Sequence, residues 1–304
     1  MAAQFGNLYR ETTEAEAIGA VQEAWDAGIR YFDTAPHYGL GLSERRLGAA
    51  LSAFPRDEFV ISSKVGRLLE PSPETADRQD TEGFAVPASV RRRWDFSRDG
   101  IFRSVEATLA RTGLDRVDIL YLHDAEDHWG QASSEGIAAL IELREQGVVS
   151  AVGAGMNSSV ELADLVDRWD VDLVMLAGRY TLLEQGALDD LMPLAVEKQV
   201  GVVIAGVYNS GLLSQPRPPA DAKYNYEQAP ASLLDRANRI ADVCERHGVD
   251  LPTAALAYVL LHPAVASVVV GVRNAGQVAS NVERYNETVP VELWAELREA
   301  RLIP

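Results

Sequence analysis

Helix-like and strand-like segments alternate from one end of this chain to the other, and that rhythm constrains the fold more than any single motif. Three of the strand-like segments, 149–152, 173–177 and 201–205, are almost continuously apolar. Strands have this composition when both of their faces are buried, and parallel sheets have both faces covered by helices. Between such runs, apolar residues recur at helical spacing, as they do over 13–27. The alternation therefore predicts a parallel sheet whose successive strands are joined by helices.

The segments are numerous enough to close a barrel. Strands that follow helices are predicted at 29–32, 59–64, 117–123, 148–155, 172–177, 201–206 and 267–270, and one more, cut short at the N-terminus, at 2–5. Helices are predicted at 13–27, 43–51, 97–112, 136–146, 159–169, 188–199, 233–247, 253–261 and 277–285. Such βα units favour a (β/α)8 TIM barrel over an open doubly wound sheet. The barrel is expected to be one domain over 1–304, with an extra C-terminal helix at 291–301.

Two segments that contain several prolines interrupt the rhythm, 65–96 and 207–232. Each follows a predicted strand, so each is expected over the C-terminal face of the barrel. Long ordered loops on that face act as lids or determine specificity. The alternative is an insertion without function.

Composition and motifs exclude several classes of protein. The net charge is −17 and the longest basic run, Arg91–Arg93, is interpreted as a solvated turn in preference to a loop that contacts a ligand, so nucleic-acid binding is disfavoured. One cysteine, Cys244, forms no internal disulfide. With no signal peptide and no apolar run of transmembrane length, this predicts a cytoplasmic protein without a membrane partner. No metal-ligand spacing, P-loop, Gly-x-Gly-x-x-Gly or Gly-x-Ser-x-Gly motif is found.

Residues capable of proton chemistry lie at the C-terminal ends of three predicted strands. Asp33, Lys64 and His123 each follow or end one strand, and Tyr38 lies in the loop after Asp33. In a barrel these positions share one cavity. A phenol has a pKa of about 10, so proton transfer near neutrality requires a cation beside it. Lys64 is expected to lower the pKa of Tyr38, Asp33 to keep Lys64 charged, and His123 to hold the substrate oxygen.

With these residues in place, the chain resembles the aldo-keto reductases over essentially its whole length. The most specific matches are 33–39 with Ser43 and Glu44, then Lys64, then 122–123. The resemblance implies that the catalytic tetrad of the family falls on Asp33, Tyr38, Lys64 and His123. Family chains also begin with a hairpin at the barrel base, and this N-terminal hairpin is expected to be missing here.

Segments 153–157, 177–183 and 208–213 are similar to one branch of that family, the L-fucose and D-threo-aldose 1-dehydrogenases, which also contains pyridoxal 4-dehydrogenase. The resemblance implies that a hydride passes from the anomeric carbon of an aldose to NAD(P), giving the lactone. Three alternatives stay open: oxidation of pyridoxal to pyridoxolactone, carbonyl reduction with NADPH, and a nucleotide-binding regulatory subunit without catalysis. The oligomeric state also stays open.

The resemblance further implies a nicotinamide cofactor bound without a Rossmann domain. The expected contacts are Asn157 at the carboxamide, Tyr208 beside the ring, Ser210, Gly211 and Leu212 at the pyrophosphate, and Gly271, Arg273, Gln277 and Asn281 after the last strand. Family members that prefer NADP place a lysine near Gly271 and an arginine at the position of Gln277, to hold the 2′-phosphate. Because both are absent, NAD is expected to be preferred and NADP to bind more weakly.

The substrate pocket is expected to be lined by Tyr9, His37, Trp94 and Trp129. Aromatic rings there suit the stacking of pyridoxal, whereas a sugar needs hydrogen-bonding partners. The sequence offers both kinds of side chain.

Overall fold

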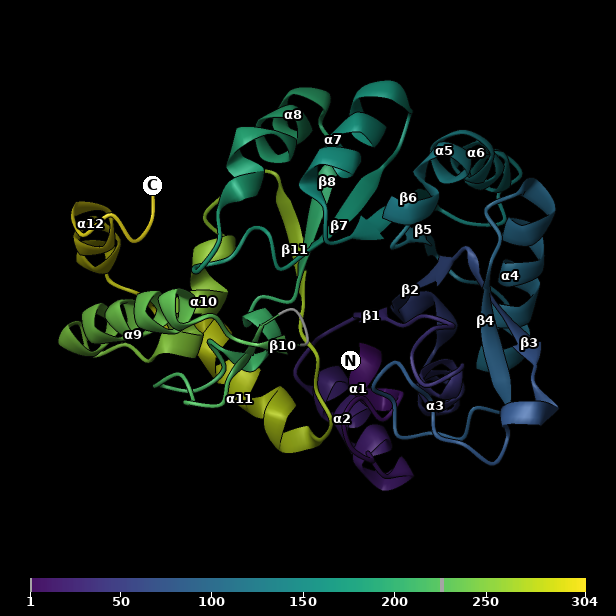
Figure 1. Ribbon diagram of the computed structural model, residues 1–304, viewed down its shortest axis with the longest axis horizontal. Coiled ribbons are helices and arrows are strands. Elements are labelled where there is room, and N and C mark those ends of the chain that lie inside the picture. The colour runs from purple at the N-terminus through teal and green to yellow at the C-terminus, as the bar shows by residue number, and fades with distance from the viewer. Residues whose placement is uncertain (1, 225–226) are drawn as a thin grey trace. The chain divides into compact units, whose positions relative to one another are not determined.

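The computed structural model describes residues 2–224 and 227–304, in which parallel strands alternate with helices (Figure 1). Seven strands form one sheet in the order β1-β2-β5-β6-β7-β8-β11. Their bounds are Tyr31–Asp33 (β1), Val60–Val65 (β2), Ile119–His123 (β5), Ala151–Met156 (β6), Leu173–Ala177 (β7), Gly201–Ala205 (β8) and Val265–Val269 (β11). β1, β2, β5 and β6 pair in parallel one after another, and β8 pairs in parallel with β11. This alternation confirms the (β/α)8 TIM-barrel class.

Helices follow the predicted periodicity closely. Their bounds are Glu14–Asp26 (α2), Leu42–Leu51 (α3), Arg98–Thr112 (α4), Trp129–Gln131 (α5), Ile137–Glu145 (α6), Ser159–Arg168 (α7), Leu191–Lys198 (α8), Ala231–Arg246 (α9), Leu251–Val259 (α10), Ala275–Asn286 (α11) and Val291–Glu299 (α12). The last of these confirms the extra C-terminal helix.

Two compact units can be distinguished along the chain. The first contains the residues up to Met156 together with Arg168–Val174 and Val270–Ser280. The second contains Asn157–Asp167, Met175–Val269 and Asn281–Pro304. The single domain predicted over 1–304 stays a prediction.

The predicted strand at 2–5 is wrong. Ala2–Phe5 forms a short helix, α1, with Phe5 fully buried. After it, Gly6 lies so close to the loop of Tyr38 that a Cβ on Gly6 would come within 2.4 Å of the Tyr38 carbonyl carbon. A four-residue apolar run has too little periodicity to distinguish a strand from one helical turn, so packing against this loop decided the conformation.

Capping residues explain where two helices begin, and a turn explains a third. Thr13 caps α2 in a reciprocal box with Glu16, and Ser97 accepts a hydrogen bond from the Gly100 amide at the start of α4. The helix predicted at 43–51, for which Ser43 is a possible N-cap residue, is α3, and Ser43 does not cap it. The helix begins one residue earlier, after Gly41, whose left-handed φ of 81° a glycine adopts without strain.

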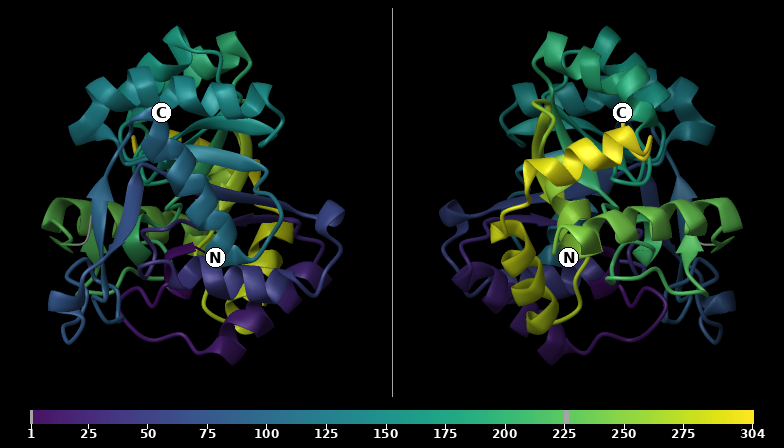
Figure 2. Two further views of the ribbon diagram at one scale, coloured as in Figure 1. Left: turned by 90° about the vertical axis from the view of Figure 1, so that its right-hand side faces the viewer. Right: turned by 90° about the vertical axis from the view of Figure 1, so that its left-hand side faces the viewer.

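The long segment at 65–96 is an ordered part of the first unit. Arg67–Pro71 (β3) and Val90–Trp94 (β4) form an antiparallel hairpin that the periodicity did not predict, visible as two neighbouring strands in Figures 1 and 2. Between them, Phe84 and Val86 are buried against Leu40, and Tyr38 packs on the same cluster. This segment therefore packs directly on the loop that carries Tyr38.

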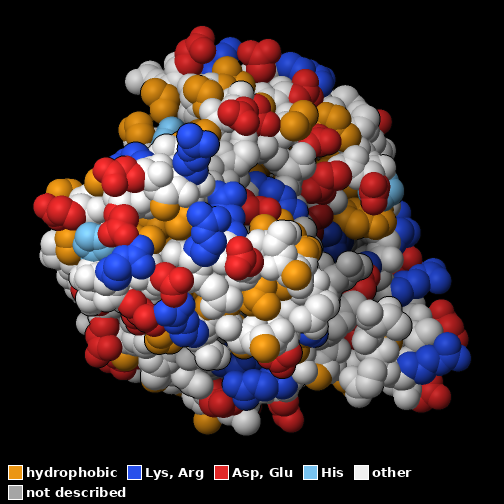
Figure 3. Space-filling view, turned by 60° about the vertical axis from the view of Figure 1, so that its left-hand side comes forward, with side chains coloured by type: hydrophobic (Ala, Val, Ile, Leu, Met, Phe, Trp, Pro, Cys, Tyr) orange, Lys and Arg blue, Asp and Glu red, His pale blue; other side chains and the backbone are white. Residues whose placement is uncertain are grey.

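The second unit carries its own insertion and a surface of mixed charge. Lys223–Tyr224 (β9) and Glu227–Gln228 (β10) pair as a short antiparallel ribbon within 207–232. Acidic and basic side chains are interspersed on the face shown in Figure 3. Arg217 is ion-paired with Asp242 and Glu245, and Arg246 with Glu296. None of the helices in the described ranges has both the length and the apolar composition to cross a bilayer.

Candidate active site

Asp33 and Lys64 form a buried ion pair at the ends of adjacent strands. The register pairs Asp33 of β1 with Ser62 of β2, so Lys64 lies two residues further on and points to the same face as Ser62. Lys64 Nζ lies 2.9 and 2.7 Å from the two carboxylate oxygens of Asp33 and donates to Thr34 O at 3.0 Å. Each side chain is only 2% exposed. Two neighbouring parallel strands therefore hold this pair rigidly.

Further hydrogen bonds orient this pair, and the charge of Lys64 follows from its surroundings. Ser62 Oγ donates to Asp33 Oδ1 at 2.7 Å, and Tyr31 OH donates to Ser62 Oγ at 3.0 Å. Burial by itself would lower the pKa of Lys64, but Asp33 and Tyr38 together outweigh burial, and the pKa lies above its ordinary value. Lys64 is therefore an ammonium at every pH at which the protein is used.

Tyr38 lies close to the Lys64 ammonium, yet its pKa is raised, whereas the sequence predicted that it would be lowered. Lys64 Nζ lies 4.8 Å from the centre of the Tyr38 ring. Burial raises the pKa of Tyr38 to about 12, and the nearby Lys64 only partly offsets that effect. The expected lowering fails because Asp33 already neutralises the lysine, while the loss of water destabilises the phenolate. Tyr38 is a phenol in this structure.

His123, which ends β5, completes the group as a neutral imidazole. Its ring centre lies 5.7 Å from that of Tyr38, with the two planes at 86°. Burial, followed by the charges of Arg67 and Lys64, holds the pKa of His123 well below its ordinary value. His123 Nδ1 is buried and has no hydrogen-bond partner among the described residues. A buried, unpaired ring nitrogen next to a phenol is a place where a ligand oxygen or a water is expected to bind.

The structure thus brings together Asp33, Tyr38, Lys64 and His123 within the first unit. Asp33, Lys64 and His123 are buried, whereas Tyr38 and His37 retain accessible surface. Proton chemistry at a bound hydroxyl or carbonyl is what this arrangement permits, because a phenol lies between a fixed cation and a neutral imidazole.

The residues expected to line the pocket lie at different distances from this group. The His37 ring lies 5.8 Å from Tyr38 and 5.7 Å from His123, centre to centre. Trp94 is one step further out, stacked on the Arg67 guanidinium at 4.2 Å. Tyr9 is half exposed, and its backbone amide donates a hydrogen bond to Gly83 O at 2.7 Å. Trp129 is the first residue of α5.

Sequence reasoning missed two arginines of the hairpin β3–β4 and the aspartate that follows His123. Arg67 of β3 pairs with Asp124, whose Oδ2 lies 3.4 Å from His123 Nε2. Arg92 of β4 donates from Nε to His37 Nδ1 at 2.7 Å. The solvated turn assigned to 91–93 is wrong: Arg92 is 10% exposed, whereas Arg91 is 63% exposed. Three consecutive arginines carry no alternation in the sequence, so only the strand geometry separates a buried Arg92 from an exposed Arg91.

In the second unit, the residues expected to hold the cofactor follow β6 and β8. Asn157 comes directly after β6, and Tyr208 OH donates to Asn281 Oδ1 at 2.8 Å, which joins two of the expected contacts. Asn209, Ser210 and Gly211 all have left-handed φ, at 44°, 58° and 98°. Backbone turns of this kind form anion-binding concavities, which fits a pyrophosphate. Leu212 is fully buried.

In the first unit, the expected contacts after β11 are engaged with the chain itself. Arg273 Nη1 donates to Thr12 Oγ1 at 2.9 Å and to Arg10 O at 3.2 Å, and Nη2 donates to Leu8 O. Gln277 Oε1 accepts from the Arg273 amide at 2.8 Å. A Cβ on Gly271 would lie within 2.4 Å of the Gln4 side chain. The Arg273 guanidinium thus fastens the N-terminal segment.

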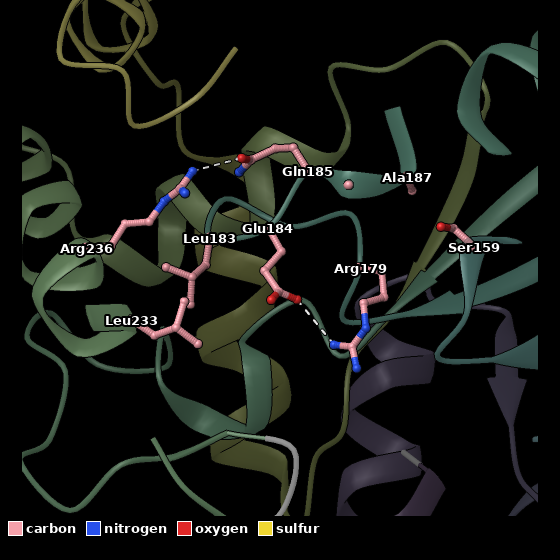
Figure 4. Close-up of a pocket in the computed structure, with 9 residues that line it drawn as sticks. Ser159, Arg179, Leu183, Glu184, Gln185, Ala187, Leu233 and Arg236 are labelled. Atoms are coloured by element: carbon pink, nitrogen blue, oxygen red, sulfur yellow. Dashed lines mark hydrogen bonds and ion pairs between the residues drawn. The ribbon is translucent and has the colours of Figure 1, made fainter. Parts of the chain in front are cut away.

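The second unit also contains a cavity of about 290 Å³ that holds none of the predicted site residues (Figure 4). Its lining residues are Ser159, Arg179, Leu183, Glu184, Gln185, Gly186, Ala187, Leu233 and Arg236. The charges in it are already partnered: Arg179 Nη1 lies 3.2 Å from Glu184 Oε2, and Arg236 Nη2 donates to Gln185 Oε1 at 3.0 Å.

Known proteins resemble this chain in sequence and in fold. The sequence matches the Aldo/keto reductase family over residues 2–301. D-threo-aldose 1-dehydrogenase from Pseudomonas sp is 50% identical, with 100% of this chain and 93% of the relative covered. Pyridoxal 4-dehydrogenase from Microbacterium luteolum is 38% identical, with 99% and 92% covered. The solved structure of the aldo-keto reductase AKR11C1 from Bacillus halodurans in its holo form superposes with a TM-score of 0.76 at 26% identity, with 100% of this chain and 91% of that chain covered.

Proposed function

We propose that this chain, which belongs to the aldo/keto reductase family, oxidises the anomeric carbon of an aldose of the L-fucose or D-threo type with NAD(P) and releases the lactone. It is an oxidoreductase of a family that uses nicotinamide cofactors. The observation that carries the proposal is the buried Asp33–Lys64 pair beside Tyr38 and His123. The name of the relative that is 50% identical supports the aldose as substrate. The one cysteine of the chain, Cys244, is buried and forms no disulfide, which fits a reducing compartment such as the cytoplasm.

Each residue of the tetrad has a distinct task in this reaction. A bound nicotinamide ring supplies the acceptor for the hydride. Tyr38 takes the proton of the anomeric hydroxyl, and the Lys64 ammonium stabilises the negative charge that the phenol oxygen carries before that transfer. Asp33 orients Lys64, and the neutral imidazole of His123 holds the substrate oxygen in place. Fixing the reacting carbon next to the ring supplies much of the rate.

The rate of aldose oxidation is expected to rise with pH well beyond neutrality. The pKa of Tyr38 is about 12, so the phenolate fraction increases through the whole accessible range. We expect kcat/KM to increase by about tenfold per unit between roughly pH 7 and pH 10. Initial rates of NADH formation at saturating NAD measure this. A plateau that begins near neutrality would show that the tyrosine is activated as the sequence had suggested.

We propose that NAD is preferred over NADP because neither of the two residues expected near the 2′-phosphate, Arg273 and Gln277, offers it a free positive charge. Arg273 is engaged with the N-terminal segment, and Gln277 is neutral. Gln277→Arg is expected to raise the NADP to NAD ratio of kcat/KM by on the order of tenfold, through a charge-assisted hydrogen bond. Gln277→Met removes the same amide without adding charge and serves as the control. If both variants keep the wild-type ratio, Gln277 does not face the ribose.

The experiment that tests the function is a spectrophotometric screen of NAD and NADP reduction. The substrates are L-fucose, D-arabinose, L-galactose, D-galactose, L-rhamnose and pyridoxal. Reduction of NAD by one of the aldoses supports the proposal. Reduction of NAD by pyridoxal alone would favour the second candidate function, that of a pyridoxal 4-dehydrogenase. The rings of His37 and Phe84, whose centres lie 5.1 Å apart, offer aromatic surface for a pyridine ring. Absence of turnover with every substrate, despite cofactor binding, would contradict both.

A further inference from the structure

His37 offers a hydrogen-bond donor at the edge of the tetrad. Its ring packs against Tyr38, Phe84 and His123, with centre-to-centre distances of 5.8, 5.1 and 5.7 Å. The side chain is 13% exposed, so part of the ring stays open to a ligand. Unlike Asp33 and Lys64, this residue can therefore touch a substrate directly.

Arg92 determines which nitrogen of that ring carries the proton. Its Nε lies 2.7 Å from His37 Nδ1. A guanidinium only donates, so Nδ1 must be the acceptor and the proton of the neutral ring lies on Nε2. No acceptor for this Nε2–H is found within the described residues, and Nε2 is not enclosed. The donor is thus available to a ligand.

Arg92 is itself held in place on several sides. Its Nη1 and Nη2 donate to the Asp80 carboxylate at 2.6 and 3.2 Å, and Nη2 donates to His37 O at 3.2 Å. Glu82 Oε1 lies 3.3 Å from Nη1. The Asp80 side chain is 4% exposed, so a buried carboxylate holds the Arg92 guanidinium in place.

The surroundings keep His37 uncharged. Burial and then the cations Arg67, Arg92 and Lys64 lower the pKa of His37 to about 2, although Glu82 lies 3.7 Å from Nδ1. His123 and Tyr38 face the same ring and are both neutral. One tautomer of a neutral imidazole therefore persists over the working pH range.

We propose that Arg92 is a positioning residue which fixes His37 so that its Nε2–H donates to an oxygen on the carbon adjacent to the reacting carbon of the substrate. In an aldose this oxygen is the hydroxyl at carbon 2. The inference rests on the proposed function for the identity of that substrate, but the arginine–histidine contact stands on the structure alone. Because Arg92 is a residue of β4, this role of Arg92 would make the hairpin β3–β4 a determinant of substrate specificity.

The test combines a spectroscopic and a kinetic readout on Arg92→Met, with Arg91→Met as the matched control. Arg91 lies on the same strand and is 63% exposed. Nitrogen NMR of the histidine-labelled protein, with His37 assigned by His37→Phe, is expected to show a neutral ring protonated at Nε2 in the wild type and in Arg91→Met. Arg92→Met is expected to show exchange between tautomers.

Kinetics then ask whether the donor reaches the substrate. For an oxidised aldose, Arg92→Met and His37→Phe are each expected to lower kcat/KM by about 10- to 100-fold, the usual loss for one such hydrogen bond in a site. With the corresponding 2-deoxy aldose, kcat/KM should fall far less in both variants. The ratio of kcat/KM between the aldose and its 2-deoxy analogue should therefore be smaller than in the wild type. If Arg92→Met does not fold, His37→Phe alone still tests whether His37 donates to the 2-hydroxyl.

Two outcomes would overturn the inference. One is a wild-type His37 that is protonated at Nδ1 or doubly protonated at neutral pH. The other is an unchanged preference for the 2-hydroxyl in both variants. Failure of the proposed function looks different: the wild-type enzyme then oxidises no aldose, while the NMR result still decides how Arg92 and His37 interact.

Discussion

Tyr38→Phe is expected to lower kcat for aldose oxidation by about 100- to 10,000-fold, the range that positioned proton transfer usually contributes. The substitution removes one oxygen from a ring that already packs on Phe84 and Val86 through its apolar surface. The fold and the affinity for the cofactor should therefore hardly change. Stopped-flow measurement of NADH formation, together with a binding titration of NAD, separates the two effects.

The matched control is Tyr285→Phe, which removes the same oxygen from a side chain that is 65% exposed on α11. It should behave as the wild type. A Tyr38→Phe enzyme that retains full turnover would remove Tyr38 from the mechanism and with it the assignment of the tetrad. A loss confined to cofactor affinity would indicate that the phenol positions the nicotinamide instead.

Lys64→Met is expected to be the most damaging single substitution for both stability and activity. It leaves the Asp33 carboxylate, 2% exposed, without its partner and strips Thr34 O of a donor. Breaking a buried pair on one side typically destabilises a protein by about 3–5 kcal/mol. Turnover should fall below detection, because the phenolate of Tyr38 then lacks the cation that stabilises it. Urea denaturation and initial rates measure the two losses.

A double variant separates the two roles of this pair. Asp33→Asn with Lys64→Met removes both charges, so most of the lost stability should return, since replacing a buried ion pair with neutral groups is often close to neutral. Activity should stay absent. Lys198→Met, at a lysine 39% exposed on α8, is the surface control. If Lys64→Met unfolds at the wild-type urea concentration, the pair is not buried in solution as it is here.

Much of the fold could be predicted from the sequence because it depends on local pattern. Apolar runs of strand length, separated by helical periodicity, are sufficient to place β2, β5, β7 and β8 within a residue or two. The hairpin β3–β4 was missed because neither strand alternates apolar and charged residues, and the long segment 72–89 separates the two strands. The helix at Ala2–Phe5 was missed because four residues hold no period.

The candidate site shows the same division. Spacing along the chain was enough to place Asp33, Lys64 and His123 at strand ends, and the register of β1, β2 and β5 brings them together. Spacing could not show that Arg273 would be engaged by the carbonyls of residues 8 and 10. That contact joins parts of the chain more than 260 residues apart, and no local pattern encodes it.

Local sequence pattern is enough to specify the alternation of buried strands and helices and the identity of the groups at the strand ends. Both features follow from periodicity and residue type, which can be identified without knowing the tertiary contacts of each residue. The tertiary structure alone decided the pKa of Tyr38, which burial raises to about 12 against the pull of Lys64, and the tautomer of His37, which Arg92 sets at 2.7 Å. Both depend on how much water is excluded and on which charge lies a few ångströms away, and the fold creates those quantities only once distant segments have packed together.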